Sequence, residues 1–123
     1  MSPSVRNIIA WILQVLLAVA FIMSGFKKLS DLDNTVKMFG SMGLPGWFAA
    51  FIGGAELLGG VGLLIPRTVR PAALGLIIIM IGAVVMHATK IPGGIANGVP
   101  AIVMLALLAV ILVLRRPTTS RLA

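Results

Sequence analysis

Cysteine and tyrosine are absent from this 123-residue sequence, and acidic residues are scarce. Three residues are Asp or Glu, two are tryptophan and one is histidine. Without cysteine the chain cannot form a disulfide, a dithiol redox centre or a thiolate metal site, and we expect no metal among its site ligands. The four-helix membrane enzymes that shuttle disulfides are therefore excluded as mechanistic models. One histidine supplies at most one imidazole ligand per chain, so we do not expect a haem.

Apolar residues are what the chain has in excess. Hydrophobic residues make up 59% of the sequence and charged residues 11%, and the mean hydropathy is +1.13. A soluble domain of this size could not bury so much apolar surface. The excess falls in four predominantly apolar runs, which cover residues 8–25, 47–65, 72–89 and 99–114.

These runs predict the fold. They hold 18, 19, 18 and 16 residues, and a helix that crosses the bilayer core needs about 17–25, so three fit and the last falls just short. A single apolar run can cross only as a helix, because its backbone must be hydrogen-bonded internally. We therefore predict an all-α fold in which residues 1–123 form one domain, an integral membrane bundle of four transmembrane helices.

The connections between the runs predict how the helices are arranged. Residues 66–71 form a very short link, so the second and third helices should be antiparallel neighbours. Residues 90–98 contain a proline and three glycines and should form an irregular turn. In the longest connection, Asp33 or the asparagine after it could cap a short helix with Val36 and Phe39 on its apolar side. We expect this helix to lie in the interface across the outer ends of the bundle; a solvated loop is the alternative.

Basic residues outnumber acidic ones, and the net charge is +7. They lie at the ends of the apolar runs, where cationic side chains anchor helices to lipid headgroups and orient them, so we expect no nucleic-acid partner. An N-terminus in the cytoplasm places every arginine on the inner side and every lysine on the outer side, and we predict that both termini are cytoplasmic. The arginines are Arg6, Arg67, Arg70, Arg115, Arg116 and Arg121, and the lysines are Lys27, Lys28, Lys37 and Lys90.

Glu56 lies inside the second apolar run. At about 100° per residue it shares a helical face mainly with small residues, among them Gly53, Gly59 and Gly60. Small residues let membrane helices approach closely, so we expect these glycines to pack against neighbouring helices and Glu56 to point into the bundle. A charged group at bilayer depth costs at least ~2.5–3.5 kcal/mol, so this carboxyl group needs a partner or a neutral state.

The first apolar run carries a matching stripe. Five residues recur at spacings of three and four and share one helical face: Gln14, Ala18, Phe21, Gly25 and Lys28. Counted inward from the outer ends of the runs at ~1.5 Å per residue, Gln14 and Glu56 come to nearly the same depth. We therefore expect a hydrogen bond between Gln14 and Glu56, with Gly25 in the helix contact. Lys28 lies near the outer mouth and should need a long reach to Glu56.

His87 lies about one turn from the outer end of the third apolar run. Together with Glu56 and Lys28 it could line one cavity that opens outward, and Asn97 could join from the third connection. Such polar groups in an apolar cavity suit a flat apolar ligand that carries carbonyl oxygens. Each residue also has a simpler interpretation: Glu56 as a clip between helices, His87 as an interfacial residue without a ligand and Lys28 as a headgroup anchor.

Several segments, taken in order, resemble the DoxX-like membrane proteins. They are "SGFKKLSD", "MGLPGW", "GGAELLGG", the short basic turn, "AVVMHATK" and "LRRP". The resemblance extends from Ala20 to Pro117 and implies a four-helix protein of the bacterial cytoplasmic membrane. The family takes its name from a subunit associated with quinone-linked sulfur oxidation. Other members are linked to quinone or catechol stress and to membrane complexes with redox-defence enzymes. The matching positions make Lys28, Glu56 and His87 candidate site residues.

The resemblance and the residues together predict a subunit that binds a quinone-like or lipid-like ligand and supports a membrane redox or oxidative-stress system. No intrinsic cofactor motif is present, so we expect an accessory subunit rather than a complete oxidoreductase. The expected partners are membrane lipids, a quinone-like or other apolar small molecule, a soluble redox protein and a second copy of the chain.

Two other functional classes stay open. One is a small proton-coupled transporter that uses Glu56, and the other is a membrane assembly factor. Small multidrug exporters also have four helices and one essential membrane glutamate. Their glutamate lies in the first helix and their pockets are rich in aromatic residues, whereas this chain has its glutamate in the second helix and contains no tyrosine.

Overall fold

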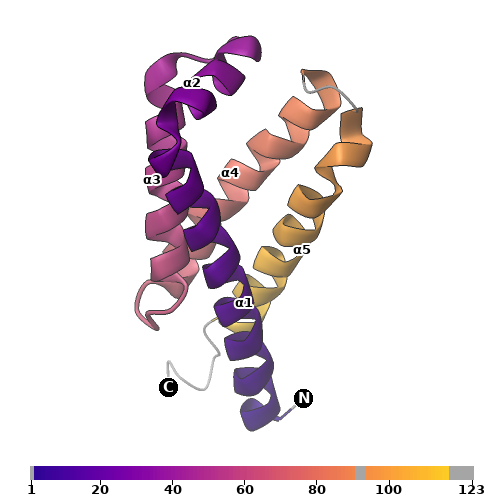
Figure 1. Cartoon of the computed structure of the whole chain (residues 1–123). Coiled ribbons are helices and arrows are strands. Elements are labelled where there is room, and N and C mark those ends of the chain that lie inside the picture. Colours follow the sequence, from indigo (N-terminus) through magenta and orange to yellow (C-terminus); the bar gives the residue numbers. More distant parts are fainter. Residues whose placement is uncertain (1, 91–93, 117–123) are drawn as a thin grey trace.

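The computed structural model describes residues 2–90 and 94–116, and all regular structure in those ranges is helical (Figure 1). Five α-helices follow one another, and a short 3-10 helix, η1, precedes the last. Their bounds are α1 Pro3–Ser30, α2 Leu32–Ser41, α3 Gly46–Gly62, α4 Val69–Thr89, η1 Gly94–Gly98 and α5 Val99–Leu114. The predicted all-α fold is confirmed.

The long helices form two pairs, α1 with α3 and α4 with α5 (Figure 1). The pairs meet where α3 contacts α4 and where α1 contacts α5. At one end of the molecule Arg6 Nη2 donates to Val113 O at 3.2 Å, which ties the start of α1 to the end of α5. Toward the other end, where α2 packs on α1 and α3, the two pairs diverge.

Two helices in the described part of the chain, α1 and α4, are long and apolar enough to cross a membrane. They have 28 and 21 residues. Helices α2 and α3 would pass together as one span, but they are bent by 117° at the break between them. Helix α5 is apolar and has 16 residues. The fold therefore matches a helical membrane protein with two or three helical segments of full spanning length.

Helix α1 extends past both ends of the apolar run that predicted it. It begins at Pro3, a residue suited to a first turn, and Ser2 Oγ accepts a hydrogen bond from Val5 N at 3.2 Å. At the other end, Lys27 and Lys28 lie in the last turn, where cationic side chains favour the negative end of the helix dipole. The helix therefore continues beyond Gly25 to Ser30, and this length changes which residues meet across the bundle.

Helix α2 is the short helix expected between the first two apolar runs. It starts at Leu32 and its N-cap residue is Asp31, so the expected cap at Asp33 is two residues too late. Phe39 is buried and its ring centroid lies 6.2 Å from that of Phe48 on α3. Gly43 has φ +82°, a left-handed conformation that glycine adopts readily, and this turn lets the chain reverse sharply into α3.

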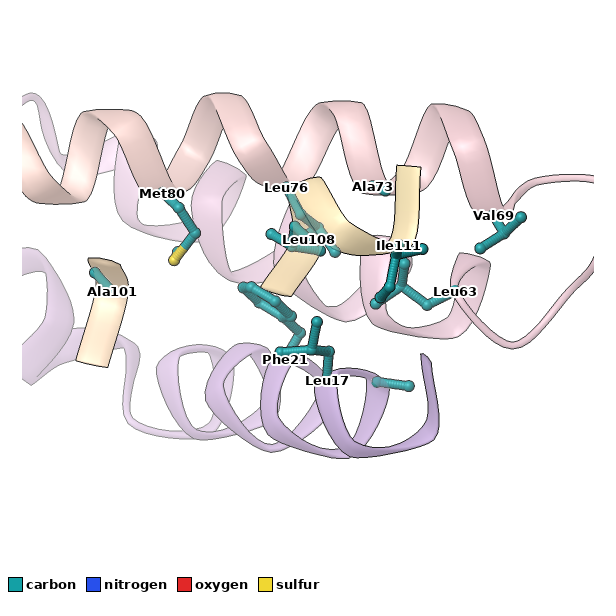
Figure 2. Packing of buried hydrophobic residues seen from close by; sticks show 11 residues of the cluster. Leu17, Phe21, Leu63, Val69, Ala73, Leu76, Met80, Ala101, Leu108 and Ile111 are labelled. Atoms are coloured by element: carbon teal, nitrogen blue, oxygen red, sulfur yellow. The ribbon is translucent and has the colours of Figure 1, made fainter. Parts of the chain in front are cut away.

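One apolar core joins α1, α4 and α5 (Figure 2). Phe21 of α1, Leu76 of α4, and Leu108 and Ile111 of α5 are almost completely buried within it, together with Leu63 from the end of α3. Burying side chains of this size stabilises a helix contact by dispersion and close packing.

Glycines let α3 approach its neighbours. A Cβ atom at Gly25 would lie 2.5 Å from Gly53 O and 2.6 Å from Leu57 N, both backbone atoms of α3. A Cβ atom at Gly60 would lie 3.0 Å from Ala18 O of α1. At Gly59 it would lie 2.7 Å from a Leu76 side-chain atom of α4. The backbones of α1 and α3 are therefore in direct contact at the level of Gly25.

Candidate functional site: a buried ion pair

Glu56 points into the bundle, as its helical face predicted. The residue is 3% exposed, and four residues of the same face are also buried: Ala49, Gly53, Gly60 and Leu63. Trp47, Phe51 and Leu58 on the opposite face are 67%, 58% and 74% exposed. The carboxyl group is therefore held between helices, and the bulky apolar face of α3 is left for lipid.

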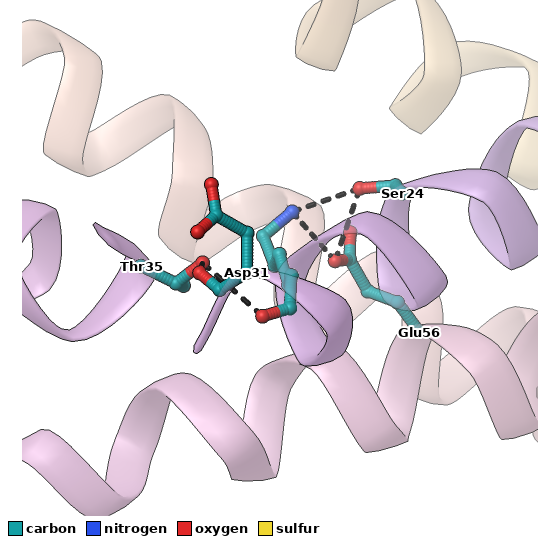
Figure 3. A network of polar contacts seen from close by, with 5 residues as sticks. Ser24, Asp31, Thr35 and Glu56 are labelled. Carbon is teal, nitrogen blue, oxygen red and sulfur yellow. Dashed lines mark hydrogen bonds and ion pairs between the residues drawn. The ribbon is translucent and has the colours of Figure 1, made fainter. Parts of the chain in front are cut away.

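The partner of Glu56 is Lys28 (Figure 3). Lys28 Nζ lies 2.8 Å from Glu56 Oε1, and the same ammonium donates to Ser24 Oγ at 2.8 Å. Ser24 Oγ in turn donates to Glu56 Oε1 at 3.2 Å. Three polar side chains from α1 and α3 therefore form a closed cluster in apolar surroundings. The Lys28 side chain keeps 24% of its surface exposed, against 5% for Glu56.

Two sequence-based expectations about this carboxyl group are wrong. Gln14 does not bond Glu56, and Lys28 reaches Glu56 directly rather than from a distant mouth. The cause is the length of α1. Because this helix continues to Ser30, Gly25 lies against Gly53 and Leu57, well below the start of α3. This offset brings Ser24 and Lys28 to the level of Glu56 and moves Gln14 to the level of Leu63.

Helix α2 is tied to the backbone that carries Lys28. The hydroxyl oxygen of Thr35, a buried residue, lies 3.2 Å from Lys28 O and 3.0 Å from Asp31 O, and its proton can serve either carbonyl (Figure 3). Lys28 O lies in the last turn of α1, where a helix leaves its carbonyl acceptors unpaired, and Asp31 O, in the turn before α2, also accepts from Thr35 N at 3.1 Å. The contact therefore fixes both the end of α1 and the position of α2 beside the ion pair.

Gln14 belongs to a second polar cluster at the other end of α1. Its Nε2 donates to Leu63 O at 2.7 Å, and its Oε1 accepts from Arg115 Nε at 2.7 Å. Arg115 Nη1 also donates to Asn7 Oδ1 at 2.8 Å, and the guanidinium carbon lies 5.5 Å from the Trp11 ring centroid. Partial burial lowers the pKa of the Arg115 side chain from its ordinary value, because the charged form loses hydration.

His87 lies apart from the ion pair. Its Nδ1 is 2.9 Å from Ala83 O, so this nitrogen carries a hydrogen and donates it to the carbonyl. A Cβ atom at Gly98 would lie 2.9 Å from His87 Cβ, which places the side chain against η1. The structure thus brings Lys28 and Glu56 together and leaves His87 at a different contact. The side chain of Asn97, the remaining candidate, lies outside what the structure describes.

Some residues of the two polar clusters were not predicted from the sequence, although their spacing indicates them. Ser24 precedes Lys28 by four residues and therefore shares its helical face. The stripe that begins at Gln14 also continues backward through Trp11 and Asn7, at spacings of three and four. The signal for Arg115 was weaker, because its pairing depends on how α1 and α5 meet.

Comparison with known proteins identifies the family. A family model described as the DoxX-like family matches residues 12–113. In Bacillus subtilis (strain 168), a protein named "Putative oxidoreductase CatD" is 31% identical over 81 residues, a stretch that covers 66% of this chain and 60% of that protein. The match thus spans less than two thirds of the relative's length. No solved structure matches this chain. Since the family model extends from α1 into α5, this chain belongs to the DoxX-like family of membrane proteins.

Proposed function

We propose that this chain binds the headgroup of a quinone-like ligand beside the Lys28–Glu56 pair and supports a membrane redox or oxidative-stress system. The observation that carries the proposal is the 2.8 Å contact between Lys28 Nζ and the buried Glu56 carboxylate, inside helices that are otherwise apolar. The relative named as an oxidoreductase supports the redox part of the proposal. In this view the chain is an accessory subunit, and a separate redox protein supplies electrons.

The energetics of the pair favour a functional role. Ionisable groups in membrane helices are costly, and well-packed apolar residues can replace a buried ion pair with little loss of stability. Helix packing alone therefore gives no reason to place this pair between α1 and α3. A lysine ammonium has three N–H donors, and the described contacts of Lys28 use two of them. The third donor, on a side chain that is 24% exposed, can bind a carbonyl oxygen of a ligand.

The same groups suit the chemistry of a quinone. Reduction of a quinone to a quinol takes up two electrons and two protons at its carbonyl oxygens. The Lys28 ammonium would stabilise the negative charge that develops on one oxygen, and Glu56 would hold the ammonium in place. Ser24 bonds both groups, so it would keep their geometry when the ligand enters or leaves.

In the proposed membrane arrangement, α1, α3, α4 and α5 all cross the bacterial cytoplasmic membrane. Helix α3 has 17 residues and α5 has 16, which is close to the lower limit of about 17 for crossing. Both termini would face the cytoplasm, with α2 in the outer interface above the ion pair. The ligand would then enter from the outer leaflet.

The direct test is binding of a short-chain ubiquinone or menaquinone analogue to the purified full chain. We expect Lys28→Met and Glu56→Gln each to weaken binding about tenfold or more, as for loss of one hydrogen bond to a charged group. Lys27→Met is the matched control, because it removes the same charge from the neighbouring exposed position of α1. If Lys28→Met folds poorly, the double variant Lys28→Met/Glu56→Gln also removes the negative charge left unpaired on Glu56. It should fold better and bind the quinone as weakly as Lys28→Met.

Several outcomes would contradict the proposal. Absence of quinone binding by the wild type, or equal binding by all variants, would leave Lys28 and Glu56 as a clip between helices. Proton-coupled flux in proteoliposomes that Glu56→Gln abolishes, without quinone binding, would instead favour a small transporter. His87→Ala in the same binding series tests whether His87 contributes, and unchanged binding would remove His87 from the site.

A further inference from the structure

A second site lies at the opposite end of the molecule, beneath the start of α4. An open cavity of about 280 Å³ is lined by the first half of α1, the turn into α4, the start of α4 and the residue after α5. The side chains that give it a polar lining are Asn7, Gln14, Arg70 and Arg115, and Trp11 forms an aromatic wall. None of these residues takes part in the Lys28–Glu56 cluster.

The cavity is strongly positive. It contains two guanidinium groups, and the sequence has only three acidic side chains, Asp31, Asp33 and Glu56. Asp33 lies in α2, Asp31 in the turn before it, and Glu56 in the ion pair with Lys28, all at the other end of the bundle. No Asp or Glu side chain of this chain therefore neutralises Arg70 and Arg115. The partial burial that lowers the Arg115 pKa adds to the free energy that a bound anion would recover.

The two guanidinium groups are held in place before any ligand arrives. Arg115 is fixed by its bonds to Gln14, which is completely buried, and to Asn7. Arg70 Nη1 donates to Leu112 O at 3.1 Å. A guanidinium group has five N–H donors, and these contacts use two on Arg115 and one on Arg70. The remaining donors suit the oxygens of a phosphate group, which arginine binds in a forked geometry.

The start of α4 adds to the positive electrostatic potential in the cavity. Thr68, the residue before α4, makes no side-chain hydrogen bond that caps the helix. The first turn of α4 contains no acidic residue. Val69, the first residue of this 21-residue helix, lines the cavity. The unpaired N–H groups and positive dipole end of a helix favour an anion at this place.

We propose that this cavity binds the phosphate group of an anionic phospholipid from the leaflet at the arginine end. Exposed apolar residues lie close in sequence to its lining residues: Ile8 and Ile12 of α1 are 58% and 54% exposed, and Val113 of α5 is 52% exposed. They offer a surface for acyl chains, which a free phosphate ion lacks. Trp11 also has the amphipathic ring that favours the boundary between headgroups and hydrocarbon.

Native mass spectrometry of the full chain in detergent, titrated with phosphatidylglycerol, tests the proposal. We expect one tightly retained lipid per chain and weaker retention of phosphatidylcholine, whose trimethylammonium group offsets the phosphate charge. Arg70→Gln and Arg115→Gln should each weaken retention of phosphatidylglycerol about tenfold, the size expected for one lost hydrogen bond between charged groups. Arg67→Gln and Arg116→Gln are matched controls, because both residues are exposed near the same end and neither lines the cavity.

Three results would overturn the proposal. Equal weakening by the control variants would mean that diffuse charge holds the lipid. Displacement of phosphatidylglycerol by millimolar inorganic phosphate would mean that a free anion is the ligand. Equal retention of phosphatidylcholine would mean that the headgroup charge is not recognised. If Arg115→Gln does not fold because Gln14 loses its partner, Arg70→Gln decides the matter, and neither variant should change quinone binding at Lys28.

Discussion

Glu56 can be paired inside the bundle because glycine backbones let α1 and α3 touch. Gly25 and Gly53 face each other at this contact, and Ser24 and Lys28 flank it on α1. The ion pair of 2.8 Å therefore depends on residues that have no side chain. The pairing of the Glu56 carboxylate with Lys28 and the close packing of α1 on α3 therefore depend on each other.

Gly25→Ala should destabilise the protein strongly. Its Cβ atom would lie 2.5 Å from Gly53 O and 2.6 Å from Leu57 N, and backbone atoms cannot move aside as a side chain can. We expect a loss of about 1–3 kcal/mol, as for overpacking, measured by thermal unfolding in detergent. Gly54→Ala is the control, because nothing lies within 4 Å of its Cβ position. An equal loss in both variants would refute the close contact of α1 and α3.

A double-mutant cycle on Lys28 and Glu56 should show coupling. Lys28→Met leaves the Glu56 carboxylate without its cation, and Glu56→Gln leaves the Lys28 ammonium without its counter-charge, so we expect each change to cost about 1–3 kcal/mol of stability. This is below the ~3–5 kcal/mol for fully buried pairs, because the Lys28 side chain is 24% exposed and partly hydrated. The double variant should recover part of the loss in the same unfolding assay. Strict additivity of the two single losses would show that the pair does not interact.

At this scale the sequence could reveal which way Glu56 faces but not its partner. A helical face follows from spacing along one chain, and the small residues around Glu56 marked its inward direction. The level at which two helices meet depends on their lengths and offset. The apolar run ends at Gly25, yet α1 continues to Ser30, and the neighbours of Glu56 are therefore Ser24 and Lys28 and not Gln14.

At the scale of elements, α2 is the part of the fold best placed to influence the ion pair. Its Thr35 binds the carbonyl of Lys28, and its Phe39 packs on Phe48 of α3. Helix α2 therefore contacts both helices that carry the ion pair, α1 and α3. A partner protein that displaced α2 would act first on the backbone of Lys28.

Thr35→Val tests this tie. The change keeps the shape of the side chain but removes the hydroxyl that lies 3.2 Å from Lys28 O and 3.0 Å from Asp31 O. We expect about 1 kcal/mol lower stability and faster amide exchange in α2, measured by hydrogen–deuterium exchange mass spectrometry. Ser30→Ala, which removes an exposed hydroxyl bond within α1, should leave exchange in α2 unchanged. Equal exchange in Thr35→Val and the wild type would mean that packing alone positions α2.

The existence of each helix was easier to predict than its ends. Apolar runs mark the part of a helix that must avoid water, so they revealed α1, α3, α4 and α5. Polar turns at helix ends lie outside that pattern, and α1 gained both of its end turns from Ser2, Pro3 and the lysines near its end. Helix α3 instead stops at Gly62, before the end of its apolar run, and the following residues turn toward Thr68.

At the scale of the whole molecule, the two ends differ in charge and in chemistry. The end with the ion pair carries lysines together with all the acidic side chains, and the other end carries arginines around a polar cavity. This polarity predicts the orientation with α2 outside and the start of α1 in the cytoplasm, because basic residues are retained on the cytoplasmic side.

Cysteine labelling tests the orientation in intact cells. Cysteine introduced by Ser41→Cys, at the exposed end of α2, should react with a membrane-impermeant maleimide added outside. Cysteine introduced by Ser4→Cys, at the exposed start of α1, should react only after the cells are opened. Because the natural chain contains no cysteine, neither variant has a competing thiol. The reverse pattern would place the quinone-like site on the cytoplasmic side.

In the proposed orientation, the separation of arginine from acidic side chains would also couple the protein to the membrane voltage. Five arginines of the described ranges lie at one end, whereas four lysines at the other are offset by three acidic residues. Turning the molecule over would carry a net four charges across the potential, at about 2.3 kcal/mol per charge per 100 mV. An energised cell, negative inside, would therefore oppose inversion by roughly 9 kcal/mol at 100 mV. The bioenergetic state of the cell would then help to keep the ion pair facing outward.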